Sequence, residues 1–97
     1  MPIYDSVWDL LNALGCTFSE EEKALLHVRA QIGGQLLAYR ARHKLTQKEL
    51  AKRVGVSPVT ISHIERGDTD VSLKTLVRIC VKLGGKLKID LGLDNAE

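Results

Sequence analysis

The stretch from residue 45 to residue 67 constrains this chain most, because it reads as two short helices joined by a tight turn. Thr46 followed three residues later by Glu49 is a capping box, in which each side chain bonds the other residue's backbone amide and so starts a helix. Gly55 can take the left-handed conformation that ends a helix. Ser57 then caps the second helix, so only a short turn connects the two helices.

Both short helices carry apolar side chains at helical spacing. The expected buried positions are Leu50, Ala51, Val54, Ile61 and Ile64. The small side chain of Ala51 allows the close approach of two helices that a helix-turn-helix requires.

Extended through Leu83, this stretch resembles the helix-turn-helix of the Cro/phage-repressor (XRE) family and covers about half of the chain. The matching residues are Gln47, Leu50-Ala51, Gly55-Val56-Ser57, Ile61-Ser62 and Glu65-Arg66-Gly67. The resemblance implies an all-α fold, a lambda-repressor-like helix-turn-helix bundle, and binding to double-stranded DNA. Family members also join their first helix to the end of the recognition helix by an ion pair, which the resemblance assigns to Arg40 and Glu65.

In this family the second helix of the motif lies in the major groove. By family position, the residues that face the bases are Pro58, Val59, Ser62 and His63, with Ser57 at the start of this surface and Thr60 near the DNA backbone. Gln47 matches a position that contacts phosphate. Lys48 and Arg53 are further candidates for phosphate contacts, and the alternative is that both are solvated surface charges.

The net charge of +2 hides an uneven distribution. Residues 29–66 carry eight basic and two acidic side chains, whereas residues 1–28 carry one basic and five acidic ones. Positive charge therefore concentrates around the motif, as expected of a DNA-binding surface, although charge alone also fits a solvated basic face. Asp68 and Asp70 follow the recognition helix, where relatives often have basic or neutral residues, and this difference argues against phosphate contacts from that loop.

The composition fits one small domain. No apolar run is long enough to span a membrane, and the acidic N-terminus does not resemble a signal peptide, so we expect a cytoplasmic protein without membrane contact. Cys16 and Cys80 form no CxxC pair and are expected to be reduced thiols. The three histidines have no carboxylate or cysteine at ligand or triad spacing, so we expect no enzyme, metal or cofactor.

We expect residues 1–18 to form a helical extension outside the family's core and residues 19–84 to form the DNA-binding domain. Trp8, in the extension, either packs in a core or anchors a protein partner. A long helix is expected from Glu20 to about His43. The pair Gly33-Gly34 marks either a break in this helix or a close helix crossing, and the sequence leaves both open.

Residues 85–97 are expected to be a dimerisation strand and a tail. Polar and apolar residues alternate from Lys86 to Leu91, which predicts a short C-terminal β-strand with Leu87, Ile89 and Leu91 on one face. A lone strand needs a partner, either the same strand of a second copy or residues 1–4. A homodimer would in turn favour a palindromic operator.

Together these features predict a dimeric transcriptional repressor. The capped last helix, followed by Leu83-Gly84-Gly85 and a short strand, resembles antitoxins of the HigA/HipB type, which repress their own operon and neutralise a toxin. The acidic N-terminal extension would suit a basic toxin. The alternative is a stand-alone XRE-family regulator without a toxin partner. The sequence gives neither the operator, nor the toxin, nor an inducer.

Overall fold

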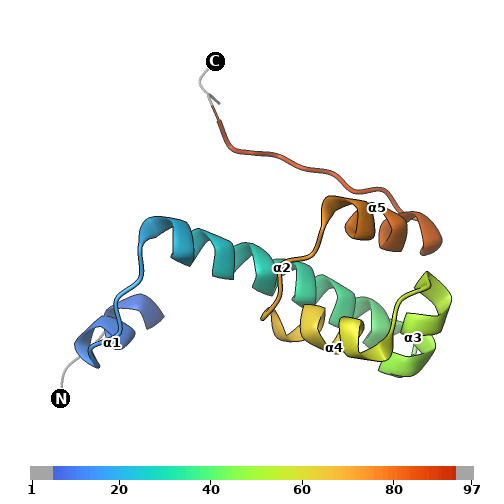
Figure 1. Ribbon diagram of the computed structural model, residues 1–97, viewed down its shortest axis with the longest axis horizontal. Coiled ribbons are helices and arrows are strands. Elements are labelled where there is room, and N and C mark those ends of the chain that lie inside the picture. Colours follow the sequence, from blue (N-terminus) through green and yellow to red (C-terminus); the bar gives the residue numbers. More distant parts are fainter. Residues whose placement is uncertain (1–5, 94–97) are drawn as a thin grey trace.

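The computed structural model describes residues 6–93, and in this part the chain forms five helices. They are α1 (Val7–Ala13), α2 (Glu20–Arg42), α3 (Gln47–Val54), α4 (Pro58–Arg66) and α5 (Leu73–Lys82). The long α2 runs through the molecule, with α3, α4 and α5 gathered at its C-terminal half (Figure 1). At the other end, α1 lies away from this bundle (Figure 1). None of the helices within residues 6–93 has the length and hydrophobicity needed to cross a membrane.

A hydroxyl side chain starts every one of these helices. In each case the hydroxyl accepts the backbone N–H three residues later; the capping residues are Ser6, Ser19, Thr46, Ser57 and Ser72. Ser19 and Thr46 belong to full capping boxes, because Glu22 and Glu49 also accept the N–H of the capping residue at 2.8 Å. These caps satisfy amides that a helix's first turn otherwise leaves unpaired.

The core is small and lies entirely between the C-terminal half of α2 and helices α3 to α5. Its buried hydrophobic side chains are Leu36, Leu50, Ala51, Val54, Ile61, Ile64 and Ile79. Neither α1 nor the part of α2 before Gly33 contributes a buried residue. Arg29 is the first residue of α2 whose side chain bonds the bundle, through Asp70. We call α1 and the part of α2 before Arg29 the N-terminal projection.

The glycine pair in α2 marks a close helix crossing and not a break. The helix runs without interruption from Glu20 to Arg42. A Cβ atom on Gly33 would lie 2.8 Å from the carbonyl oxygen of Glu65 in α4, whereas a Cβ on Gly34 would meet nothing within 4 Å. Gly33 therefore lets the α2 backbone approach the α4 backbone directly.

The predicted C-terminal β-strand is not found in the described residues, so the fold prediction was wrong on this point. Residues 85–93 follow α5 as an extended segment that leaves the bundle (Figure 1). Alternating side chains favour an extended backbone, but a strand also needs a neighbouring strand for its hydrogen-bond ladder, and residues 6–93 provide none. The alternative partner, residues 1–4, lies outside the described residues.

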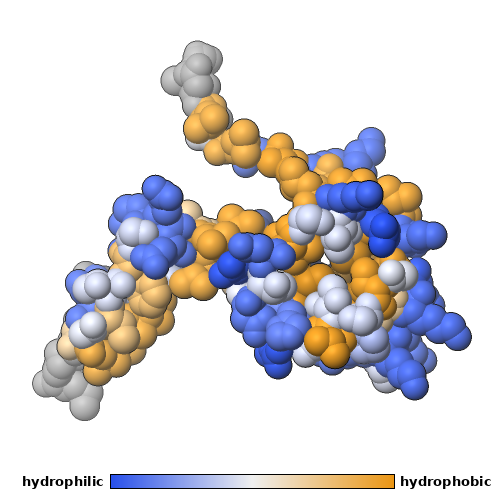
Figure 2. Space-filling model, viewed as in Figure 1, coloured by the Kyte–Doolittle hydropathy of each residue, from blue (hydrophilic) through white to orange (hydrophobic). Residues whose placement is uncertain are grey.

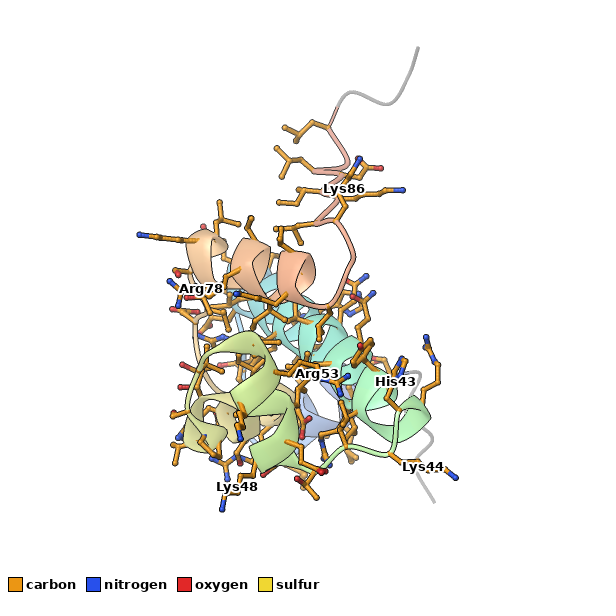
Figure 3. All side chains as sticks on the ribbon, turned by 90° about the vertical axis from the view of Figure 1, so that its right-hand side faces the viewer. His43, Lys44, Lys48, Arg53, Arg78 and Lys86 are labelled. Carbon is orange, nitrogen blue, oxygen red and sulfur yellow. The ribbon has the colours of Figure 1, made fainter. Side chains whose placement is uncertain are left out.

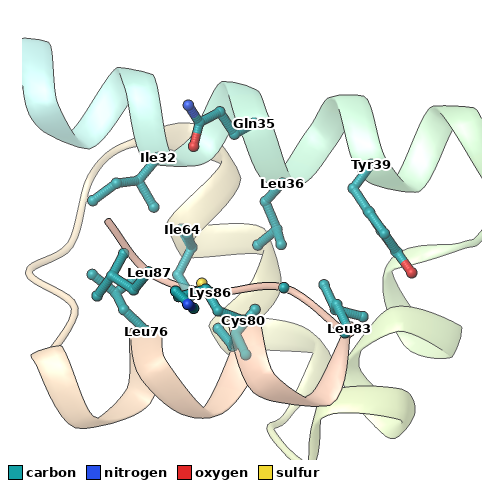
Figure 4. A pocket seen from close by; sticks show the side chains of 13 residues that line it. Ile32, Gln35, Leu36, Tyr39, Ile64, Leu76, Cys80, Leu83, Lys86 and Leu87 are labelled. Carbon is teal, nitrogen blue, oxygen red and sulfur yellow. The ribbon is translucent and has the colours of Figure 1, made fainter. Parts of the chain in front are cut away.

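A hollow of about 340 Å³ opens between α2, α5 and the first residues after α5. Ile32 and Leu36 line it from α2, Leu76 and Leu83 from α5 and its end, and Leu87 from the C-terminal segment (Figure 4). Beyond Leu87 the apolar side chains of the segment are 60–76% exposed. The segment thus begins against the bundle and then carries apolar side chains into solvent.

Candidate nucleic-acid interface

The turn between α3 and α4 fixes how the two short helices cross. Gly55 has a left-handed backbone with φ of 79°, and its N–H donates to the carbonyl of Ala51 at 2.9 Å. The N–H of Val56 donates to the same carbonyl at 3.0 Å. Because Ala51 is 1% exposed and carries only a methyl group, α4 can pack closely on α3.

Helix α4 buries one face and exposes the other. Ile61 and Ile64 are at most 2% exposed. The residues expected to face the bases are Pro58, Val59, Ser62 and His63, and they lie within about 140° of one another around the helix. Pro58 and Val59 are exposed, the latter by 64%, and Ser62 and His63 are half-buried. Thr60 turns towards the cap, since its hydroxyl lies 2.9 Å from that of Ser57.

A partly buried polar network ties α4 to α2 and α3. The guanidinium of Arg40 donates from Nε and Nη2 to the two carboxylate oxygens of Glu65, at 2.8 and 3.0 Å, and from Nη1 to the carbonyl of Leu45 at 3.1 Å. Gln47 donates from Nε2 to the same carboxylate at 3.0 Å. The Glu65 side chain is 6% exposed, so this two-pronged pairing is what makes its burial tolerable.

The same network sets the charge state of Glu65. Burial, the largest influence, raises the pKa of this carboxyl, but the hydrogen bonds from Arg40 and Gln47 and the charge of Arg40 outweigh it. The net effect lowers the pKa of Glu65 below its ordinary value, and the bond to Glu65 raises the pKa of Arg40. Both groups are therefore charged at neutral pH.

The candidates for phosphate contacts on α3 do not share one surface. Gln47 already donates one side-chain hydrogen to Glu65, which leaves its second amide hydrogen for a ligand. Lys48 and Arg53 are both exposed but lie about 140° apart around the helix, on different sides of α3 (Figure 3). The sequence interpretation missed Lys52, which is exposed and follows Lys48 by one helical turn. An i, i+4 comparison could have found it.

The two aspartates after α4 bond arginine and histidine side chains of the same chain. Asp70 accepts from Nε and Nη2 of Arg29 in α2, at 3.2 and 2.5 Å, and so fastens the loop to α2. Asp68 lies 2.9 Å from Nδ1 of His63 and accepts from Nε of Arg66 at 3.1 Å. The bond with His63, the largest influence, lowers the pKa of Asp68, and Arg66 acts in the same direction.

Trp8 packs within the N-terminal projection. Its ring lies edge-on to Phe18 with centroids 5.6 Å apart, and the ammonium of Lys23 is 5.9 Å from its centroid. Trp8 is half-buried by these contacts. The more exposed apolar side chains of the projection are Val7, Leu10, Leu14, Leu25 and Val28, and Figure 2 shows hydrophobic surface over α1 and the adjoining part of α2.

Two capped helices that cross at a glycine turn, the second with an open face, define a helix-turn-helix protein. The model of the helix-turn-helix family HTH_3 matches residues 36–89. An uncharacterized HTH-type transcriptional regulator of Methanocaldococcus jannaschii is 48% identical over 54 residues, which are 56% of this chain and 82% of that protein. Another, from Haemophilus influenzae, is 33% identical over 72 residues, or 74% of each chain.

Solved structures give the same assignment. An HTH_3 family transcriptional regulator from Vibrio cholerae superposes with a TM-score of 0.60 at 29% identity, over 64% of this chain but only 35% of that chain. A chain of a toxin-antitoxin module from Streptococcus pneumoniae superposes with a TM-score of 0.63 at 30% identity, over 91% of this chain and 93% of that one. The chain belongs to the XRE-type helix-turn-helix family, whose members are DNA-binding transcriptional regulators.

Proposed function

We propose that this chain is a sequence-specific repressor of transcription that lays α4 in the major groove of DNA. The orientation of α4 carries the proposal. Its inner face is held against α2 by the crossing at Gly33 and the Arg40–Glu65 pair, and its outer face is open. A recognition helix held in this way meets a groove without first having to become ordered, which favours affinity.

Reading of the bases would depend on Val59, Ser62 and His63. The exposed isopropyl group of Val59 suits a thymine methyl, and Ser62 and His63 can exchange hydrogen bonds with base edges. None of the base-facing side chains is the arginine, asparagine or glutamine that makes two-pronged contacts with a base. Part of the sequence preference would therefore come from DNA shape.

Phosphate contacts would flank this helix. Gln47 and Lys48 begin α3, where the positive end of the helix dipole attracts phosphate. We add Lys52 to this group because it lies beside Lys48, whereas Arg53 would reach a phosphate only from another side of α3. Thr60 would lie near the backbone of the DNA.

Binding isotherms on the chain's own upstream DNA and on shuffled DNA test the proposal. Val59→Ala and Ser62→Ala should each weaken specific binding by about three- to tenfold and leave non-specific binding unchanged. Lys52→Ala should weaken both and reduce the salt dependence by about one phosphate contact. Lys23→Ala, on the projection, is the matched control. Equal affinity for the two DNAs would rule the proposal out.

We also propose that the chain acts as a homodimer on a palindromic operator. Leu87, Ile89 and Leu91 alternate along the C-terminal segment, and the last two are 60% and 76% exposed. Contact between two copies through these side chains would remove them from water. Two copies related by a twofold axis would present two α4 helices to successive major grooves.

A second role, as the antitoxin of a toxin–antitoxin pair, is favoured by one observation. The likeness to the Streptococcus pneumoniae toxin-antitoxin module extends over 91% of this chain, far beyond residues 36–89. The projection also combines exposed apolar side chains with acidic ones at Asp9, Glu20, Glu21 and Glu22, which suits a basic toxin. A stand-alone regulator is the alternative.

Co-expression with the product of the adjacent gene separates the two roles. For an antitoxin, the neighbour should arrest growth when expressed alone, and this chain should restore growth and copurify in a fixed ratio. Trp8→Ala should weaken that complex, because it removes the ring that supports the projection, whereas Val59→Ala should not. A harmless neighbour, or no copurification, would leave the stand-alone regulator.

A further inference from the structure

The end of α4 holds a polar cluster that the proposed DNA contacts do not explain. Gly67 closes α4 in a left-handed conformation with φ of 70°, and the chain then turns back, so that the N–H of Asp68 meets the carbonyl of His63 at 3.4 Å. This turn brings the Asp68 carboxylate against the imidazole, with Oδ1 2.9 Å from Nδ1. Nη2 of Arg66 lies 3.0 Å from the same Nδ1. We call His63, Arg66 and Asp68 the His63 cluster.

The ring nitrogen Nδ1 cannot bond both neighbours at once. A guanidinium can only donate, so Arg66 needs an unprotonated Nδ1. An ionised carboxylate can only accept, so Asp68 needs a protonated Nδ1. One proton on Nδ1 therefore decides which neighbour is bonded. In either case Arg66 keeps a separate bond from Nε to Oδ2 of Asp68, which holds the cluster together.

A hollow beside His63 brings one further charged side chain, that of Asp70, towards the cluster. The hollow beside His63 is lined from α5 and its cap by Ser72 and Thr75, which are uncharged, and from the loop by Asp70. Asp70 is paired with Arg29 of α2. α3 contributes no residue to this hollow. The charged side chains within hydrogen-bond distance of the imidazole in the described residues are those of Arg66 and Asp68.

We propose that His63 makes DNA binding by this chain dependent on a single proton, with Asp68 and Arg66 as the positioning residues that select the state of its ring. The proposal rests on the proposed function, since His63 belongs to the open face of α4. When the imidazole is protonated, Nδ1–H donates to Asp68 and Nε2–H is free to donate to an acceptor on the DNA. The cluster then changes from neutral to a net charge of +1, which strengthens binding to a polyanion.

When the imidazole is neutral, the cluster has no net charge, and Arg66 competes for Nδ1. Binding therefore weakens as the pH rises through the range in which histidine loses its proton. His43 has other surroundings: its ring lies against that of Tyr39 at the end of α2, with centroids 4.2 Å apart and the ring planes inclined by 31°.

Affinity for the chain's own upstream DNA, measured from pH 5.5 to 8.5 at constant ionic strength, tests the proposal. Wild type should bind about three- to tenfold more tightly at pH 6 than at pH 8, as uptake of one proton allows. His63→Gln cannot take up the proton and should show a nearly flat profile. His43→Gln, the control for histidine titration elsewhere, should keep the wild-type slope. An equal slope in His63→Gln and wild type would overturn the proposal.

Imidazole ¹⁵N NMR without DNA examines the cluster itself. Asp68→Asn removes the carboxylate that accepts from Nδ1–H, so the ¹⁵N chemical shift of His63 Nδ1 should change and the signals of His43 should stay in place. If Asp68→Asn leaves the Nδ1 signal of His63 unchanged, the positioning role is overturned even if DNA binding depends on pH. If the cluster responds as expected but no DNA preference is found, the proposed function is what fails.

Discussion

Gly33 lies where α2 crosses α4, and its missing side chain sets how closely the two helices approach. Gly33→Ala should destabilise the protein by about 1–3 kcal/mol, because the new methyl group meets backbone atoms of α4 that cannot rotate away. Gly34→Ala adds the same methyl group on the open side and should stabilise the helix by about 0.5–1 kcal/mol. Urea unfolding of the two variants measures both values. Equal stabilities would mean that the crossing is not close in solution.

Protonation of Glu65 should make the stability of the bundle fall at acidic pH. Its pKa is lowered in the folded protein, so its contribution to stability is complete above the ordinary pKa of a glutamate and is lost as the pH falls below it. Glu65→Gln should cost about 1.5–3 kcal/mol at pH 7 and should lose less stability than wild type between pH 6 and pH 3. Thermal unfolding as a function of pH measures this difference.

Two other carboxyl groups should also make the stability depend on pH. Hydrogen bonds from the backbone and side chain of their capping partners lower the pKa of Glu22 and Glu49, so part of the acid sensitivity should remain in Glu65→Gln. Asp9→Asn, on a helix without buried residues, should leave the profile as it is in wild type. Parallel profiles for Glu65→Gln and wild type would contradict the role given to Glu65.

At the scale of helices, the same capping box appears twice in different surroundings. Ser19 starts α2, which contains no buried residue before Gly33, and Thr46 starts α3, which buries three. Thr46→Ala should lower global stability by about 0.5–2 kcal/mol. Ser19→Ala should instead unwind the first turns of α2 locally, with a smaller global effect. Amide hydrogen exchange separates the two, since only Thr46→Ala should speed exchange in α4 and α5.

The helix boundaries could be predicted because they are local. The hydroxyls of Ser19, Thr46, Ser57 and Ser72 and the glycine after α3 act within one turn of where they stand. The role of Gly33 could not be predicted, because it depends on the α4 backbone more than 30 positions away in the sequence. The alternation from Lys86 to Leu91 specifies an extended backbone but not its partner, and the predicted strand failed for that reason.

The candidate site also has a part that could be predicted from the sequence and a part that could not. The residues on the open face of α4 could be assigned from a resemblance, since the motif fixes which face is buried. The His63 cluster was missed, because it forms only when Gly67 turns the chain back over α4. A glycine followed by an aspartate, at the end of a helix with His63 and Arg66 in its last turn, was the available signal.

Across the whole molecule, three surfaces of different chemistry extend from one small core. The projection carries acidic and apolar side chains, and the helix-turn-helix is basic. The C-terminal segment exposes apolar side chains, seen as hydrophobic surface in Figure 2. Since α1 lies at the opposite end of α2 from α3 and α4 (Figure 1), a protein partner of α1 could bind without covering the recognition helix. This separation would allow one chain to hold DNA and a second protein together.

The apolar C-terminal segment leads to a prediction about assembly. Ile89 and Leu91 alternate with Lys88 and Asp90. In an extended backbone the two apolar side chains therefore lie on one side and the two charged side chains on the other. Ile89→Glu combined with Leu91→Glu should convert the proposed dimer to a monomer at micromolar concentration, because charges would replace the side chains that such a dimer would bury. Lys88→Glu changes charge on the opposite side and should remain dimeric. Analytical ultracentrifugation distinguishes these states.

Loss of the dimer should also change DNA binding, because binding of the second half-site follows at high effective concentration once the first is bound. The monomeric variant should bind a palindromic site about 10²–10⁴-fold more weakly than wild type, yet bind a single half-site equally well. Both measurements are needed, since weaker binding to the half-site would indicate damage to α4 and not loss of pairing. A wild-type protein that sediments as a monomer would rule out the dimer, and repression would then have to come from one copy of α4 on each site.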